Sequence, residues 1–219
     1  SARPGEDGDL RIQSSTQHPS EVQAIVAQVV GLPKNRVVVE SPRMGGGFGG
    51  KETQGNAFAA LAALAAWRTG QPVRWMLDRD LDMALTGKRH PFTADWQAGF
   101  DATGRLLAFD ADLVADGGYA WDLSGSIRDR ALYHLDNCYD LPNVRFTGRV
   151  AQTHKASFTA YRGFGGPQGM IVVEEVMDRI ARHLGLAPDA VRAANFYGDG
   201  AVTPYGQPLH DVRIGRVWE

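Results

Sequence analysis

The chain has a single cysteine, Cys138, among its 219 residues. One thiol cannot form an internal disulfide, and it cannot by itself hold an iron–sulfur cluster or a zinc–thiolate site. Such a shortage is typical of a reducing compartment, so we expect a cytoplasmic location. The sequence also lacks any apolar run near the roughly 18 residues that would cross a bilayer, and its polar first residues, 1–9, lack the apolar centre of a signal peptide.

The chain has no strong excess of charge of either sign. Its 23 lysines and arginines nearly balance its 25 aspartates and glutamates, which gives a formal charge of -2. No basic surplus therefore calls for nucleic acid or an anionic membrane. The six histidines lack the paired spacing of a metal site, and no serine lies in a nucleophile elbow. Without an initiator methionine, the sequence is expected to be a piece of a longer protein.

Glycine, in contrast, is concentrated in one stretch. Residues 45–50 contain five glycines, interrupted only by Phe48 and followed by Lys51. Glycine loses much backbone freedom on folding, so such a run indicates a sharp bend or a very close approach to a ligand. A short strand over 36–40 precedes the loop, and an apolar pattern predicts a helix over 52–69. That order would direct backbone N–H groups and a helix N-terminus at an anionic group.

Two phosphate-binding motifs nearly fit this loop. A P-loop needs serine or threonine directly after its lysine, and Glu52 stands there instead. Gly45, Gly47 and Gly50 match the dinucleotide pattern, but four residues separate them from the strand and the acidic residue expected about 20 positions later is missing. A nucleotide-binding module that uses this loop stays open as an alternative.

Hydrophobic periodicity and turn residues predict the other elements. Ser20 and Gln23 indicate a capping box at the start of a helix that Gly31 ends. Residues 78–82 are expected to form a solvated loop. Strands are expected over 10–14, 37–39, 73–77, 92–100, 106–115 and 144–153, and helices over 19–30, 52–69, 127–135, 167–184 and 188–195.

The two halves of the chain repeat one order of elements. In each half a helix, a strand, the tetrapeptide Gly-Phe-Gly-Gly and a long apolar helix follow one another, with Phe48 and Phe164 as the two phenylalanines. We infer an internal duplication within an α+β fold, in which helices cover mixed sheets in two layers. The predicted domains are 1–85, with the loop 45–50, and 86–219, with a hairpin over 92–115 and the loop 163–166. Both loops are expected to face one ligand.

Three segments together resemble a known family. They read MGGGFGGKE from Met44, RALYHLDNCYDLPN from Arg130 and AYRGFGGPQG from Ala160. In combination they are similar to the first lobe of the molybdenum-cofactor portion of xanthine dehydrogenases, and the similarity runs across almost the whole chain. It implies a molybdopterin cofactor here, 2Fe–2S clusters and FAD in other parts of the enzyme, and hydroxylation of hypoxanthine or xanthine with oxygen from water.

The resemblance assigns roles around the cofactor. Gln17 matches a glutamine that hydrogen-bonds the apical ligand of the metal, and Gly47, Phe48 and Gly49 match the loop that approaches it. Arg162 matches an arginine that contacts the pterin, for which a planar fork of donors is suited. No side chain here is expected to bind the metal directly, although Gln17 and Phe48 would lie near it.

The resemblance also assigns substrate contacts. Glu52 and Arg130 match a polar pair that orients the purine, and Phe164 matches an aromatic ring stacked against it. In the related aldehyde oxidases this pair is replaced, so its presence favours a purine, and an aldehyde-oxidising relative is the alternative. The general-base glutamate belongs to a later lobe, so no catalytic residue is expected here.

We therefore expect the fragment alone to be inactive and to bind no cofactor. Its expected partners are the purine, the remaining lobe and the iron–sulfur and flavin parts, within a homo-oligomer of the full enzyme.

Overall fold

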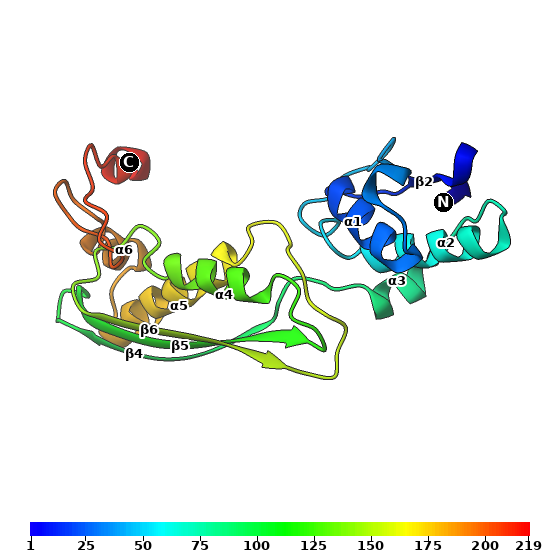
Figure 1. Cartoon of the computed structure of the whole chain (residues 1–219). Helices are drawn as coiled ribbons and strands as arrows, with labels where there is room; N and C mark the ends of the chain where they lie inside the picture. Colours follow the sequence, from blue (N-terminus) through cyan, green and yellow to red (C-terminus); the bar gives the residue numbers. More distant parts are fainter. The chain divides into compact units, whose positions relative to one another are not determined.

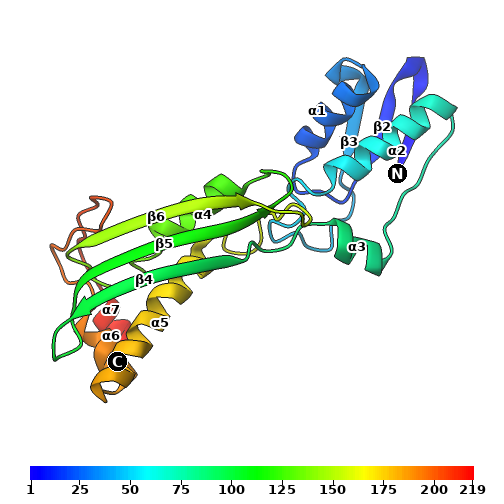
Figure 2. The ribbon, with the colours of Figure 1, turned by 90° about the horizontal axis from the view of Figure 1, so that it is seen from below.

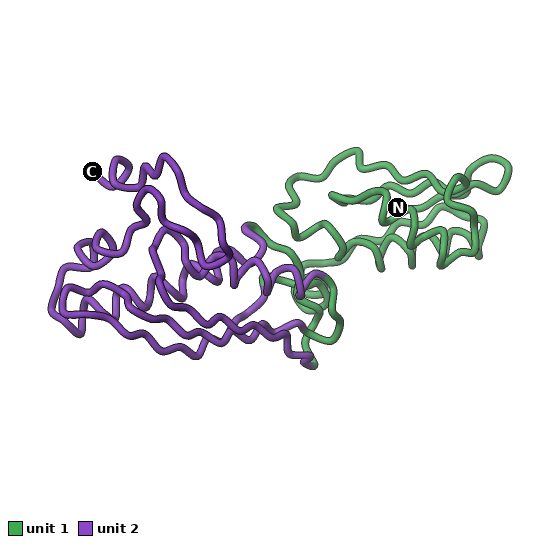
Figure 3. Tube along the Cα trace, turned by 60° about the vertical axis from the view of Figure 1, so that its left-hand side comes forward, with its two compact units in different colours: residues 1–89, 118–122, 154–162 green, residues 90–117, 123–153, 163–219 purple.

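The computed structural model describes all residues, 1–219, and the chain divides into two compact units. Unit 1 consists of residues 1–89, 118–122 and 154–162, and unit 2 of residues 90–117, 123–153 and 163–219 (Figure 3). The sequence prediction has a single boundary after residue 85, whereas the contacts assign two later segments to unit 1. Residues 154–162, which lead into the second glycine loop, are one of these segments.

Unit 1 contains a three-stranded sheet in the order β1-β2-β3. Its strands are β1 (Ala2–Pro4), β2 (Leu10–Gln13) and β3 (Val37–Glu40). Strands β1 and β2 are antiparallel, whereas β2 and β3 are parallel and are connected by α1 (Pro19–Val30). Short 3-10 turns at Glu6–Gly8 and Lys34–Arg36 complete the connections.

Helix α1 starts at Pro19, as expected, but without the predicted capping box. His18 is the N-cap and Pro19 opens the helix, since proline lacks the N–H that the first turn leaves without a partner. The amide of Gln23 donates instead to Lys34 O at 3.1 Å and to Val37 O at 2.8 Å. Gln23 therefore ties α1 to β3 and does not cap the helix.

Two further helices of unit 1 differ from expectation. Helix α2 (Asn56–Thr69) begins four residues later than predicted, because residues 51–55 form turns. The expected solvated loop at 78–82 is wrong: α3 (Arg79–Leu85) forms there, and Asp78 caps it by accepting Leu81 N–H at 2.8 Å. The expected strand over 73–77 is also wrong, since only Val73 pairs, as an isolated bridge to Ala2.

The core of unit 1 joins α1 and α2 to the sheet (Figure 1). Val22 and Val26 of α1 are fully buried, and so are Ala63 and Ala66 of α2. These side chains pack in one cluster with β-strand residues such as Leu10. The alanine-rich face of α2 lets the two helices approach closely.

Unit 2 is built on a second three-stranded sheet, in the order β4-β5-β6. The predicted hairpin is confirmed by the antiparallel pair β4 (Phe92–Phe100) and β5 (Leu106–Gly118). The third strand is β6 (Val144–Gln152). Two ion pairs join it to β5, Asp110 with Arg145 and Asp112 with Arg149. Residue numbers rise along both strands in the same direction, so β5 and β6 run parallel.

Helices α4 (Ser124–Tyr133) and α5 (Gly166–Leu184) lie on the same face of this sheet (Figures 1 and 2). They are followed by α6 (Pro188–Ala194) and α7 (Ile214–Trp218). Phe109 and Leu113 from the sheet and Val173 and Met177 from α5 form the centre of the core. No helix of the chain combines the length and apolar character needed to cross a membrane.

Both units have the same order of elements. An antiparallel strand pair is followed by a helix, a third strand parallel to its neighbour, the Gly-Phe-Gly-Gly loop and a long helix. The α+β fold is confirmed. A shared order within both units is what a duplication would produce, and the duplication itself stays a prediction.

Candidate functional site

Gln17 lies in the segment between β2 and α1, and its side chain reaches the first glycine loop. The amide oxygen accepts the backbone N–H of Gly49 at 2.8 Å and that of Lys51 at 3.3 Å. Two N–H donors require the oxygen and not the NH₂ group on that side, which fixes the orientation of the amide. The exposed NH₂ group has no protein partner and is available as a donor.

Lys51 links the two segments that form this site. Its ammonium group donates to Met44 O at 2.5 Å and to Ser15 Oγ at 2.9 Å. Its carbonyl oxygen accepts Gln17 N–H at 2.8 Å and Thr16 Oγ1 at 3.2 Å. The lysine therefore holds both ends of the loop against residues 15–17. In the sequence, Lys51 is notable only as part of an incomplete P-loop motif, so this anchoring role was not predicted.

The same contacts count against the nucleotide-binding alternative. In a phosphate loop the lysine and a helix N-terminus face the ligand. Here the ammonium of Lys51 is directed at groups of the protein, and α2 starts only at Asn56, so no helix follows the glycines directly.

Phe48 has a backbone conformation that a bulky residue seldom adopts. Its φ is 52° and that of Gly49 is 91°, and the Phe48 side chain is 63% exposed. A Cβ at Gly47 would overlap the amide of Gln17, so glycine at that position lets the Gln17 side chain lie against the loop. Strain held in place by surrounding hydrogen bonds is typical of binding and catalytic sites.

Arg162 comes from the distant segment 154–162 and completes the cluster in unit 1. Its backbone N–H donates to Phe48 O at 2.7 Å, and its guanidinium lies 5.7 Å from the centre of the Phe48 ring. Arg162 is exposed and forms no ion pair with a carboxylate of the chain. A free guanidinium of this kind is suited to an anionic ligand group.

Glu52 lies in the turn that leads to α2. Its backbone N–H donates to Gly49 O at 3.2 Å, and its carboxylate has no hydrogen-bond partner within the chain. Because the helix starts at Asn56, Glu52 is not a partner of a helix dipole. Unit 1 thus brings together six of the predicted residues: Gln17, Gly47, Phe48, Gly49, Glu52 and Arg162.

A cavity of about 580 Å³ in unit 1 borders the loop at Gly47 and Lys51. On its other side lie the segment 86–89 and Tyr161, with Arg89 placed 5.2 Å from the centre of the Tyr161 ring. The side-chain oxygen of Gln54 accepts Gly87 N–H at 2.7 Å and so fixes this segment. No sequence motif singled out Arg89 or Gln54.

Unit 2 carries the other two predicted residues, Arg130 and Phe164. Phe164 has the same φ as Phe48, 52°, and Gly165 has φ 98°. A Cβ at Gly165 would overlap Ile127 O of α4, so this loop lies directly against the helix that bears Arg130. Arg130 is exposed, and its Nε donates to His134 Nε2 at 3.4 Å.

The predicted substrate contacts therefore come from both units, Glu52 from one and Arg130 and Phe164 from the other. A common pocket for the three stays a prediction.

The donor set fits an organic cofactor. No group of three or more His, Cys, Asp and Glu side chains is arranged to hold a metal ion. In unit 1 a free amide, a free guanidinium and glycine backbone lie within one cluster instead. These groups suit an extended ligand with hydrogen-bond acceptors and an anionic group, as molybdopterin is.

Comparison with known proteins shows the family. A family model described as "Molybdopterin cofactor-binding domain" matches residues 1–196. The chain belongs to the molybdopterin cofactor-binding domain family.

Among its relatives, a protein named "Xanthine dehydrogenase/oxidase" from Felis catus is 47% identical over 215 residues. A "Xanthine dehydrogenase" from Emericella nidulans is 45% identical over 214 residues. Each match covers 98% of this chain but only 16% of the relative, so the chain spans about a sixth of their length.

Solved structures show the same domain within other enzymes. The aldehyde oxidoreductase from Desulfovibrio gigas is similar with a TM-score of 0.88 and 31% identity, over 99% of this chain and 24% of that protein. Quinoline 2-oxidoreductase from Pseudomonas putida is similar with a TM-score of 0.83 and 30% identity, over 95% of this chain and 27% of that one.

Proposed function

We propose that the chain is the first lobe of the molybdenum-cofactor-binding region of a xanthine dehydrogenase. The full enzyme would hydroxylate hypoxanthine or xanthine with oxygen derived from water, and the cofactor would supply the oxygen-transfer and redox chemistry. Similarity to proteins named xanthine dehydrogenase over nearly the whole chain supports this proposal. The observation that carries it is the free amide NH₂ of Gln17, held beside the strained Phe48 loop.

In this proposal the unit 1 cluster forms one wall of the cofactor site. Gln17 would donate a hydrogen bond from its NH₂ group, because its oxygen is occupied by Gly49 and Lys51. An amide does not titrate, so this donor would be present at any working pH. Arg162 would bind an anionic part of the cofactor, and the glycines would let it approach the backbone.

Three side chains would position the substrate. The Glu52 carboxylate would accept hydrogen bonds from a purine, and the Arg130 guanidinium would donate to it. The Phe164 ring would stack on the heterocycle. Neither Glu52 nor Arg130 forms an ion pair within the chain, so both charged groups are available to a polar ligand.

The remaining parts of the proposed enzyme would come from outside this chain. They are the later lobe with its general-base glutamate and the iron–sulfur and flavin parts, assembled into a homo-oligomer. The chain alone would then be inactive and empty of cofactor. Stoichiometric molybdenum in the isolated fragment would contradict the second statement. A cytoplasmic location also stays a prediction.

An aldehyde-oxidising enzyme is the second candidate. The high TM-score with an aldehyde oxidoreductase favours it, since the fold alone does not separate the two substrate classes. Glu52 and Arg130 separate them, because a purine needs both an acceptor and a donor, whereas an aldehyde offers one carbonyl oxygen.

The test uses the full-length protein with its molybdenum content measured first. We expect turnover of hypoxanthine, and a fall in kcat/KM of roughly 100-fold in Arg130→Met, because the site then loses its donor to a polar substrate. The matched control is Arg68→Met, which replaces an exposed arginine on α2. Turnover of aldehydes but not purines, or an unchanged kcat/KM for hypoxanthine in Arg130→Met, would reject the purine assignment.

A further inference from the structure

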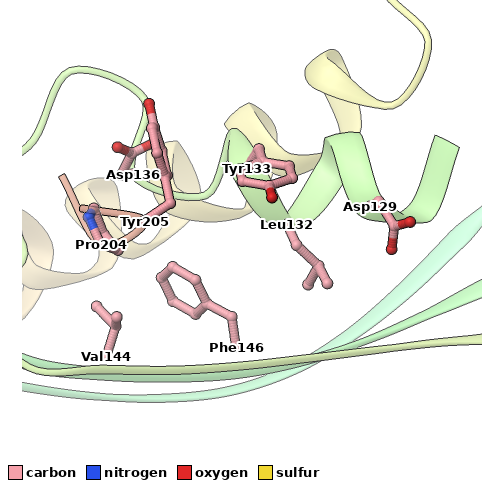
Figure 4. Close-up of a pocket in the computed structure, with 8 residues that line it drawn as sticks. All are labelled: Asp129, Leu132, Tyr133, Asp136, Val144, Phe146, Pro204 and Tyr205. Carbon is pink, nitrogen blue, oxygen red and sulfur yellow. The ribbon is translucent and has the colours of Figure 1, made fainter. Parts of the chain in front are cut away.

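Unit 2 contains a second pocket that none of the assigned residues lines. It has a volume of about 390 Å³ and lies between α4 and β6 (Figure 4). Two of its residues, Pro204 and Tyr205, belong to the segment after residue 196, where the match to the family model ends. The lining residues are Asp129, Leu132, Tyr133, Asp136, Val144, Phe146, Pro204 and Tyr205.

The decisive group in this pocket is the carboxylate of Asp136. Only 4% of this residue is exposed, and its one side-chain partner is the hydroxyl of Tyr197, at 2.8 Å. Burial raises the pKa of Asp136. No arginine or lysine pairs with it, whereas Asp110 pairs with Arg145 and Asp178 with Arg192. Backbone N–H groups at Asp136 and Asn137 also bond to the carboxylate and His134 lies near it, but no side chain of fixed positive charge pairs with this buried acid.

Aromatic rings surround the cavity next to this acid. Tyr133 and Tyr205 meet edge to face, with ring centres 5.3 Å apart and planes at 75°, and so form two walls of a corner. They remain 58% and 49% exposed, so ring surface is still open to a ligand. In Figure 4 Phe146 rises from β6 into the same space. The faces of aromatic rings are electron-rich and attract cations.

The rest of the lining is apolar. Leu132 from α4 and Val144 from β6 can pack against a hydrocarbon part of a ligand. Asp129 adds a second carboxylate at the rim, but it is half exposed and Arg128 is already bonded to it at 2.9 Å. The strongest attraction for a positive charge therefore lies at Asp136.

We infer that this pocket binds a compact organic cation, with an ammonium or guanidinium head beside Asp136 and the tyrosine rings, and an apolar body against Leu132 and Val144. The inference is independent of the molybdenum-cofactor proposal, because it uses none of the residues assigned there.

The test is an NMR titration of the 219-residue chain at constant ionic strength. The probes are choline, its neutral isostere 3,3-dimethyl-1-butanol, and N-acetylarginine methylamide, which carries the head group of a protein side chain. We expect at least one cation to shift the Tyr133 and Tyr205 resonances and to bind roughly 3- to 10-fold more tightly than the neutral isostere. The cation that binds more tightly then identifies a free amine or an arginine side chain as the natural ligand class.

Two variants with a matched control separate charge from packing. Asp136→Asn keeps an acceptor for Tyr197 and should weaken cation binding roughly 10-fold. Tyr205→Leu keeps apolar volume but removes one ring face, and should weaken it less. Asp129→Asn, the same substitution at the rim of the same pocket, should change binding by less than about 2-fold. Equal affinity for the neutral isostere, no binding of either cation, or unchanged binding in Asp136→Asn in a folded variant would overturn the inference.

Discussion

The side-chain oxygen of Gln17 accepts the backbone N–H of Gly49 at 2.8 Å, next to the strained backbone of Phe48. One hydrogen bond thus sets two things, the conformation of the glycine loop and the direction of the amide NH₂. A substitution at Gln17 should therefore loosen the loop even when no cofactor is present.

For Gln17→Ala we expect faster hydrogen exchange at the amides of Gly49 and Lys51. Both N–H groups lose their acceptor, and a partly exposed hydrogen bond contributes about 0.5–1.5 kcal/mol, so exchange should rise about 2- to 10-fold. Gln71→Ala is the control, because the Gln71 side chain is exposed and has no hydrogen bond. Unchanged exchange at both amides would mean that Gln17 does not hold the loop.

Replacing Phe48 by asparagine should stabilise unit 1. Asparagine accepts the left-handed conformation far better than phenylalanine does, and the exposed ring contributes little burial. The free energy of unfolding should rise by about 0.5–1 kcal/mol, measured by denaturant titration with native-state hydrogen exchange in α1 and α2. Cofactor retention in the full-length protein should fall in the same variant. A clear loss of stability would show that the φ of Phe48 is not strained.

Gly165→Ala should separate the second loop from α4. The new Cβ would overlap Ile127 O at a residue whose φ is 98°, and we expect a loss of at least about 2 kcal/mol in unit 2. Gly185→Ala is a matched control with φ 69° and nothing within 4 Å of the Cβ, so it measures the backbone term alone. Thermal unfolding of the two variants compares them, and equal losses would contradict the close approach.

Asp136 should make unit 2 less stable as the pH rises. Burial raises the pKa of this carboxyl in the folded state, so between its ordinary value and its raised value the folded chain binds more protons than the unfolded chain. The free energy of unfolding must then fall with increasing pH across that interval. Asp136→Asn should remove this fall, and subtraction of its pH curve from that of the parent chain isolates the effect. Both curves are measured by thermal unfolding from below the ordinary aspartate pKa to neutral pH. If the stability of the parent chain and that of Asp136→Asn change in parallel with pH, Asp136 does not cause the fall.

Long elements with clear local sequence signals could be predicted from the sequence. The hairpin β4–β5 alternates over nine residues and more, and its loop contains Gly104 with φ 84°. Helix α5 has a wide apolar face and ends at Gly185 in the left-handed conformation. In these elements local preference and burial favour the same structure.

Elements that depend on tertiary contacts could not be predicted. Strand β1 has three residues and exists because β2 pairs with it, and residues 74–77 remain irregular because only Val73 reaches a partner. The capping box expected at α1 does not form because the Gln23 side chain bonds to residues that follow the helix, and a local sequence pattern does not include them.

At the candidate site, the sequence predicted which residues take part but not the contacts between them. The motif residues of unit 1 do gather, yet the anchoring of the loop by Lys51 to Ser15 depends on a fold that brings two separate segments together. Glu52 was expected in a helix, and the turns of 51–55 leave its carboxylate free instead.

The most direct test of the account is a crystal structure of the full-length protein with its cofactor bound. The amide nitrogen of Gln17 should lie about 3 Å from an acceptor atom of the molybdenum cofactor, with the amide oxygen still bonded to Gly49. A cofactor bound elsewhere, with the Gln17 amide and the Phe48 loop facing only solvent or protein, would contradict it.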